Sequence, residues 1–189
     1  MVYIGIDPSV TNTGIVLLNG GNPYCYKIEW VDKKGGYYAT RSRDGRIQAE
    51  NWHIHAPKEK SELGRIGGLY WTSKKILDSF QIDFGTPIRI GIERPMGNNI
   101  SSAALMGMAY ASIMLGIYYR KTPDFVTTDI EITAYTPTEL KKFITGKGNA
   151  KKQIIIQQVY KKYGIEFEDD NLADAFVLAK MAEAAHAGN

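Results

Sequence analysis

Short apolar runs separated by polar turns dominate the first half of the chain, whereas longer runs with helical spacing dominate the second half. The two most apolar short runs cover residues 2–7 and 88–93 and are rich in β-branched residues. Such runs are typical of strands that are buried inside a sheet. Other strand-like patterns cover residues 14–19, 24–30, 48–55 and 130–135.

Apolar residues recur every three or four positions in the other long segments, which predicts amphipathic helices. Strands lead and helices follow, so the pattern predicts an α/β domain in which helices cover a sheet. A chain of 189 residues is long enough for one such domain with a sizeable core and too short for two. The predicted helices cover residues 61–80, 101–120, 137–143, 150–163 and 172–186.

Both of the most apolar strands end on a carboxylate, Asp7 in the first and Glu93 in the second. We expect these two side chains to lie side by side at one edge of the sheet. A third group of acids opens the last helix, where Asp170, Asn171 and Asp174 can share one helix face. Acids that converge from two strands and one helix are what a divalent-metal nuclease requires.

Four motifs lie at residues 5–14, 92–95, 141–153 and 171–175. In this order they resemble the signatures of the RuvC-type Holliday junction resolvases. The resemblance implies an RNase H-like α/β fold, with a central mixed five-stranded sheet flanked by helices, in a single nuclease domain. Residues 23–57 have no counterpart in it, so we interpret them as an inserted β-rich segment; this segment and the compact length suit a phage or viral version.

The resemblance implies a homodimeric endonuclease that depends on Mg²⁺, with Mn²⁺ as a substitute, and makes paired nicks in four-way and related branched DNA. Asp7 would bridge two metal ions, and Glu93 and Asp174 would complete the carboxylate set. The family places an acid or a histidine three residues before the final aspartate, where this chain has Asn171. Three interpretations stay open: Asn171 is a weak ligand, Asp170 substitutes for it, or Asn171 is an engineered inactivating change.

Two lysines match those that the family places near the scissile phosphate, Lys141 and Lys152. There a cation offsets transition-state charge and binds the DNA backbone. Between them, the turn at residues 146–150 precedes a helix, and we expect Asn149 to be its N-cap and the turn to bind a phosphate. A glycine C-cap with solvated lysines is the alternative. The DNA-binding residues predicted around this turn are Lys147, Asn149 and Lys151.

The loop after Glu93 lies where resolvases carry a loop that enters the junction. Met96 occupies a position where the family often has an aromatic wedge, and the alternative is a buried methionine. Asn98 and Asn99 offer donors and acceptors to phosphates or base edges. The next predicted helix, 101–120, carries small residues that suit a dimer interface or simple packing on the sheet.

Basic residues in the unmatched segment either grip DNA or form a charged surface hairpin. His53 and His55 alternate along a predicted strand, and we interpret them as a polar strand face rather than a zinc site. The basic residues of this segment include Lys33, Lys34, Arg41, Arg43 and Arg46.

The bulk composition narrows the setting. A net charge of +3 permits nucleic-acid binding without demanding it. Cys25 is the sole cysteine, which excludes an internal disulfide and favours a reducing compartment. The first strand starts close to Met1 and leaves no room for a signal peptide. Small and polar residues within the uncharged stretch 100–119 favour packing against protein over lipid. We therefore expect a cytoplasmic protein with no membrane contact.

The sequence leaves three other functions open. An RNase H-fold nuclease could act on RNA or on other structured nucleic acid. A junction-binding protein without catalysis is compatible with the neutral Asn171. An actin-like or sugar-kinase-like ATPase could use residues 5–13 as a phosphate-binding turn, but such folds need two lobes and this chain has room for one.

Overall fold

The structure is a computed structural model that describes most of the chain. It describes residues 1–20, 23–31, 36–43, 46–53, 61–79, 82, 85–96, 100–121 and 129–187.

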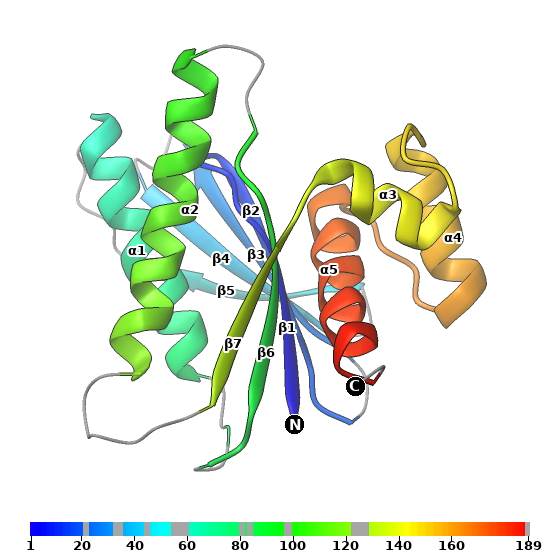
Figure 1. Ribbon diagram of the computed structural model, residues 1–189. Helices are drawn as coiled ribbons and strands as arrows, with labels where there is room; N and C mark the ends of the chain where they lie inside the picture. Colours follow the sequence, from blue (N-terminus) through cyan, green and yellow to red (C-terminus); the bar gives the residue numbers. More distant parts are fainter. Residues whose placement is uncertain are drawn as a thin grey trace.

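One mixed sheet forms the centre of this described part, and it contains seven strands in the order β5-β4-β3-β2-β1-β6-β7 (Figure 1). Neighbouring strands from β1 to β5 are antiparallel, whereas β1, β6 and β7 run parallel. The strands are β1 (Val2–Asp7), β2 (Asn12–Leu18), β3 (Tyr24–Val31), β4 (Gly36–Arg43), β5 (Arg46–His53), β6 (Ile88–Glu93) and β7 (Ile130–Tyr135).

The mixed α/β sheet is confirmed, but the expectation of five strands was wrong. The hairpin of β4 and β5 continues the sheet beyond β3, with β4 antiparallel to β3 over its whole length. Its sequence is polar and basic, so it lacks the apolar run by which a buried strand is found. The unmatched segment therefore extends the central sheet.

Helices cover both faces of the sheet (Figure 1). Helices α1 and α2 pack on one face, around a core that includes the inward side chains Ile4, Ile6 and Ile90. Helix α5 lies against the other face, with α3 and α4 beside it. The helices are α1 (Glu62–Ser79), α2 (Ile100–Lys121), α3 (Pro137–Thr145), α4 (Lys152–Tyr163) and α5 (Asp170–Ala187), each within two residues of the predicted span.

Helix α5 is buried around most of its circumference, which is why its sequence is rich in alanine. Its backbone lies directly on the sheet at three glycines. A Cβ atom at Gly5 would lie 1.7 Å from the carbonyl oxygen of Ala175, and one at Gly91 would lie 2.3 Å from that of Leu178. Gly14 makes a similar approach to the start of the helix. These glycines bring α5 close enough for its side chains to reach the ends of β1 and β6.

Candidate metal centre

Three acidic side chains from separate elements meet at one edge of the sheet. Strands β1 and β6 pair in parallel with Ile6 opposite Ile92, so the next residues, Asp7 and Glu93, leave the sheet side by side. Asp174 reaches the same place from the second turn of α5. A ligand oxygen from each carboxylate lies within 4.8 Å of the other two. The predicted convergence of these acids is thus what the structure shows.

The three carboxyl groups are perturbed because they are buried together. Burial, followed by the charges of Glu93 and Asp174, raises the pKa of Asp7 well above its usual range. Burial also raises the pKa of Glu93, and burial followed by the charge of Glu93 raises the pKa of Asp174 to about 7. Clustered acids that resist ionisation favour an environment that supplies positive charge. All three donors are carboxylate oxygens, so the set fits hard divalent cations such as Mg²⁺.

Both predicted lysines contribute charge to this centre. Lys141 and Lys152 each act to lower the pKa of Glu93 and of Asp174, and Lys152 does the same for Asp7. Burial alone would lower the pKa of Lys152, but its bond to Asp170 and the nearby carboxylates outweigh burial and raise it. The structure therefore places both lysines within electrostatic reach of the carboxylates.

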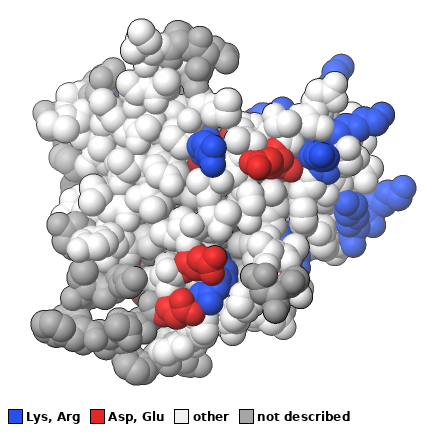
Figure 2. All heavy atoms as spheres, in the orientation of Figure 1, with Lys and Arg blue, Asp and Glu red and all other residues white. Residues whose placement is uncertain are grey.

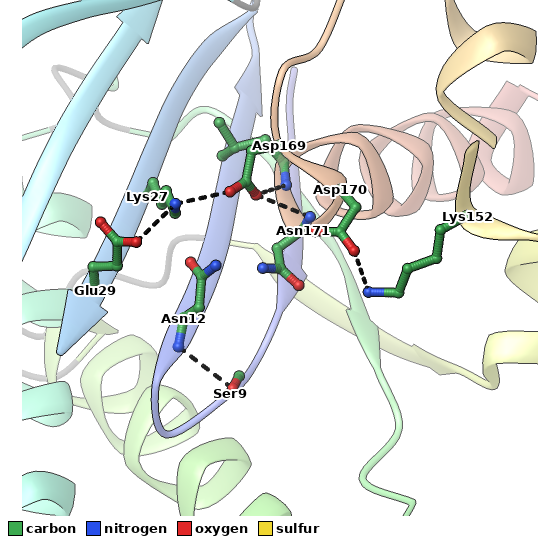
Figure 3. A network of polar contacts seen from close by, with 9 residues as sticks. Ser9, Asn12, Lys27, Glu29, Lys152, Asp169, Asp170 and Asn171 are labelled. Carbon is green, nitrogen blue, oxygen red and sulfur yellow. Dashed lines mark hydrogen bonds and ion pairs between the residues drawn. The ribbon is translucent and has the colours of Figure 1, made fainter. Parts of the chain in front are cut away.

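The two candidates for a fourth ligand point to different surroundings. Asp170 forms an ion pair with Lys152, and this bond holds the pKa of Asp170 below its usual value (Figure 3). Asn171 lies between Asp170 and Asn12, one helical turn before Asp174 (Figure 3). The Oδ1 atom of Asn12 is buried and has no hydrogen-bond partner among the described residues. The ion pair with Lys152 therefore occupies the side chain of Asp170, whereas Asn171 is a neutral amide that does not compete for the lysine.

A polar network that the sequence analysis missed anchors the start of α5. The Nζ atom of Lys27, on β3, lies 2.9 Å from a carboxylate oxygen of Asp169 and 2.9 Å from one of Glu29 (Figure 3). The other oxygen of Asp169 accepts hydrogen bonds from the backbone N–H groups of Asn171, at 3.0 Å, and Leu172, at 3.2 Å. Asp169 therefore caps the N-terminus of α5.

The pKa of Lys27 reflects this network. Burial alone would lower it, but hydrogen bonds to Glu29 and Asp169 outweigh burial and raise it. A sequence signal existed, since a lysine at an inward position of a largely apolar strand needs a partner. What the sequence could not show is that the partner lies on the last helix.

The turn before α4 differs from the prediction. Gly146 is the C-cap of α3, with a φ of 79°, and its N–H donates to the carbonyl oxygen of Lys142. The N-cap of α4 is Lys151 and makes no side-chain capping bond, so the expectation of Asn149 as N-cap was wrong. The exposed side chains of this turn include those of Lys147, Asn149 and Lys151. Figure 2 shows lysines gathered on the side of α3 and α4.

The loop after β6 is described only in part. Met96 is 58% exposed, so the alternative of a buried methionine was wrong. Asn98, Asn99, Lys33, Lys34 and His55 lie outside the described residues. The remaining basic and histidine positions of the unmatched segment, Arg41, Arg43, Arg46 and His53, lie on β4 and β5.

Comparisons with known proteins give a consistent result, although no family model matches the chain. It is 34% identical over 183 residues to the crossover junction endodeoxyribonuclease RuvC of Salinibacter ruber, covering 95% of this chain and 83% of that protein. It is 26% identical to RuvC of Moorella thermoacetica over 183 residues, covering 95% of this chain and 89% of that protein.

Solved structures show the same fold. The RuvC structure of Thermus thermophilus superposes with a TM-score of 0.59 at 21% identity, and the match covers 100% of this chain and 97% of that one. The same bacterium's RuvC in complex with a Holliday junction substrate gives 0.59 at 20% identity, over 99% of this chain and 94% of that one. The fold is therefore RNase H-like, and the chain belongs to the RuvC family of crossover junction endodeoxyribonucleases.

Proposed function

We propose that this protein is a structure-selective DNA endonuclease that resolves Holliday junctions and related branched DNA by metal-dependent phosphodiester cleavage. The observation that carries the proposal is the convergence of Asp7, Glu93 and Asp174 within 4.8 Å at the carboxyl ends of two parallel strands. The family supports the substrate, because its members are named for cleavage at crossover junctions.

The site residues have distinct roles in this proposal. When bound, two Mg²⁺ ions, or Mn²⁺ in their place, would supply an activated water and neutralise the leaving oxygen. Asp7, Glu93 and Asp174 would hold the ions, with the amide oxygen of Asn171 as a fourth, neutral ligand. Lys152 would bind the scissile phosphate while its ion pair with Asp170 orients the ammonium group.

We propose that the remaining DNA contacts come from residues near the turn before α4 and from the loop after β6. We infer that Lys141 supports the scissile phosphate, and that Lys147, Asn149 and Lys151 bind the backbone of an adjacent arm. Exposed Met96 suits a wedge at the centre of the junction. Asn98 and Asn99 follow it in the chain and would extend the same contact.

We propose that two copies of this chain form the active enzyme. Helix α2 packs on α1 and the sheet with one face and leaves an apolar stripe exposed on the other. Ile100, Met108, Leu115 and Tyr118 are between 41% and 90% exposed along this stripe. The helix is also long and apolar enough to cross a membrane, but a second copy covers the stripe in a way that suits a two-fold substrate. This model implies a cytoplasmic homodimer without membrane contact.

The solution state tests the dimer. Sedimentation at micromolar concentration should give twice the mass of the chain, and Leu115→Asp should shift the protein to a monomer, because a charge would enter the apolar contact. Lys75→Asp, at an exposed position on α1, is the matched control. A monomeric wild-type protein, both alone and with junction DNA, contradicts the dimer.

The cleavage reaction tests the function itself. A labelled four-way junction should be nicked in Mg²⁺ and left intact in EDTA. Asp7→Asn should abolish nicking and leave junction affinity within a few-fold, because lysines supply most of the DNA binding. Full cleavage by Asp7→Asn would refute the assignment of Asp7 to the active site.

A second candidate function is junction binding without catalysis. It is favoured by one observation, the neutral Asn171 where the family has an acid or a histidine. Tight junction binding by the wild-type protein, with no nicking in either Mg²⁺ or Mn²⁺, would establish it. Nicking of RNA or of RNA–DNA hybrids in preference to the junction would instead favour a nuclease of different substrate class.

We further infer that residues 1–189 act as one domain, since strands from residues 23–57 continue its sheet.

A further inference from the structure

We propose that Lys27 is a positioning residue of the metal centre, which acts by fixing the first turn of α5 and through it the amide of Asn171. The inference rests on the proposed function, because it concerns the same site. Lys27 lies on β3, outside the four motifs that carry the resemblance.

The geometry forms a continuous chain of contacts from the sheet to the helix. The Nζ atom of Lys27 lies 2.9 Å from one carboxylate oxygen of Asp169, and the two side chains are only 16% and 11% exposed. The other oxygen of Asp169 accepts a hydrogen bond from the backbone N–H group of Asn171 at 3.0 Å. One carboxylate thus joins β3 to the backbone of the residue that carries the fourth ligand (Figure 3).

Two other contacts reach this turn: Gly14 lies against the backbone of Asn171, and Asp170 pairs with Lys152 of α4. The first is a steric contact without a preferred direction, and the second is a more exposed ion pair that does not involve the sheet. The glycine contacts at Gly5 and Gly91 set how closely the middle of the helix approaches the sheet. Apolar packing is non-directional, so it tolerates small rotations about the helix axis. The bond between Lys27 and Asp169 is directional and little exposed. It therefore sets the orientation of the first turn, from which the side chain of Asn171 projects.

The placement of the ligand oxygen at residue 171 matters more for metal binding in this chain, which has an amide there, than it would in a chain with an acid. A carboxylate attracts a cation from several ångströms and has two equivalent oxygens. A neutral amide has a single oxygen ligand and no net charge, so its contribution depends on placing that oxygen at ligand distance. A residue that orients the turn should therefore have a measurable effect on metal affinity.

The test is a double-mutant cycle with metal affinity as its readout. Mn²⁺ binding is measured by calorimetry without DNA, for Lys27→Met and Lys27→Arg, each alone and combined with Asn171→Ala. We expect Lys27→Met to weaken Mn²⁺ binding roughly tenfold, as removal of an outer-shell partner does, and Lys27→Arg to retain most of the affinity. In the Asn171→Ala background, Lys27→Met should cause no further loss, because the residue through which it acts is gone.

Two further variants separate this role from simple stabilisation. Glu29→Gln removes the other, more exposed partner of Lys27 and should leave Mn²⁺ affinity unchanged. If Lys27→Met lowers stability, the double variant Lys27→Met/Asp169→Asn keeps an N-cap side chain while removing the link and the unpaired charge, and it should show the same loss of affinity.

An unchanged Mn²⁺ affinity in Lys27→Met, or an equal loss with and without Asn171, would overturn the inference. Junction nicking is measured in parallel at increasing Mg²⁺. If the wild-type protein binds Mn²⁺ but cleaves no junction, the proposed function fails while the positioning role stands. If the wild-type protein cleaves and Lys27→Met behaves like wild type in both assays, the positioning role alone fails.

Discussion

Replacing Asp174 by asparagine should stabilise the metal-free protein, and more so as the pH rises. The folded site raises the pKa of Asp174 to about 7 from an ordinary value of 3.8. Below pH 3.8 both folded and unfolded chains carry the proton, and the site is not penalised. As the pH rises towards 7, the unfolded chain has already ionised, so stability is progressively lost until the folded carboxyl ionises as well.

The linkage relation gives the size of the effect. For a folded pKa near 7, the loss between pH 5.5 and pH 8 is about 2 kcal/mol, out of a total of about 4 kcal/mol when the pH is well above 7. The side chain of asparagine has no proton to lose in this pH range, so Asp174→Asn lacks this contribution. The stability of the variant relative to wild type should therefore increase by about 2 kcal/mol across this interval.

Urea unfolding in EDTA at pH 5.5 and pH 8 measures the difference directly. Asp78→Asn, which changes an exposed acid on α1 outside the site, is the matched control. Added Mg²⁺ should stabilise the wild-type protein at pH 8, because the ion binds the folded state, and should stabilise Asp174→Asn less. If the difference in unfolding free energy between wild type and Asp174→Asn stays constant from pH 5.5 to 8, the argument that burial beside Glu93 raises the pKa of Asp174 is refuted.

Three further changes test other parts of the site and its support. Asn171→Asp should tighten Mn²⁺ binding severalfold and lower the Mg²⁺ needed for nicking, whereas an effect only from Asp170→Ala would assign the fourth ligand to Asp170. Lys152→Met should slow single-turnover nicking by roughly 100-fold without weakening Mn²⁺ binding, since the lysine stabilises the reacting phosphate rather than the metal. Gly5→Ala should cost about 3 kcal/mol in urea unfolding, because its Cβ would lie 1.7 Å from the backbone of α5; Gly67→Ala, with nothing within 4 Å, is the control.

Burial explains which elements the sequence could predict. Strands β1 and β6 are buried on both faces, so their composition alone identifies them. Helix α5 is identified by its long alanine-rich pattern. Strand β4 was missed because it pairs with β3 and β5 through backbone hydrogen bonds, which any sequence can make, while its side chains are largely polar.

The same reasoning explains what could be predicted of the site. Asp7 and Glu93 follow apolar strands directly, and parallel pairing then brings strand ends together, so a local pattern predicts a long-range contact. The contact of Lys27 with Asp169 has no such rule behind it. It depends on β3 lying two strands from β1 and on the side chain of Lys27 leaving the sheet on the face that α5 covers, which only the assembled topology determines.

A charge balance gives a physical account of how a neutral Asn171 can serve in a metal centre. Two divalent cations would bring four positive charges, and Asp7, Glu93 and Asp174 would return three negative ones. Lys152 is balanced locally by Asp170 and adds little to the sum, whereas Lys141 adds a further positive charge near the carboxylates. An aspartate at position 171 would leave the two cations and their ligands neutral. With asparagine one positive charge stays on them, and the phosphodiester supplies a compensating negative charge. The second cation would then bind most strongly when the phosphate is present, so that metal binding and substrate binding reinforce each other.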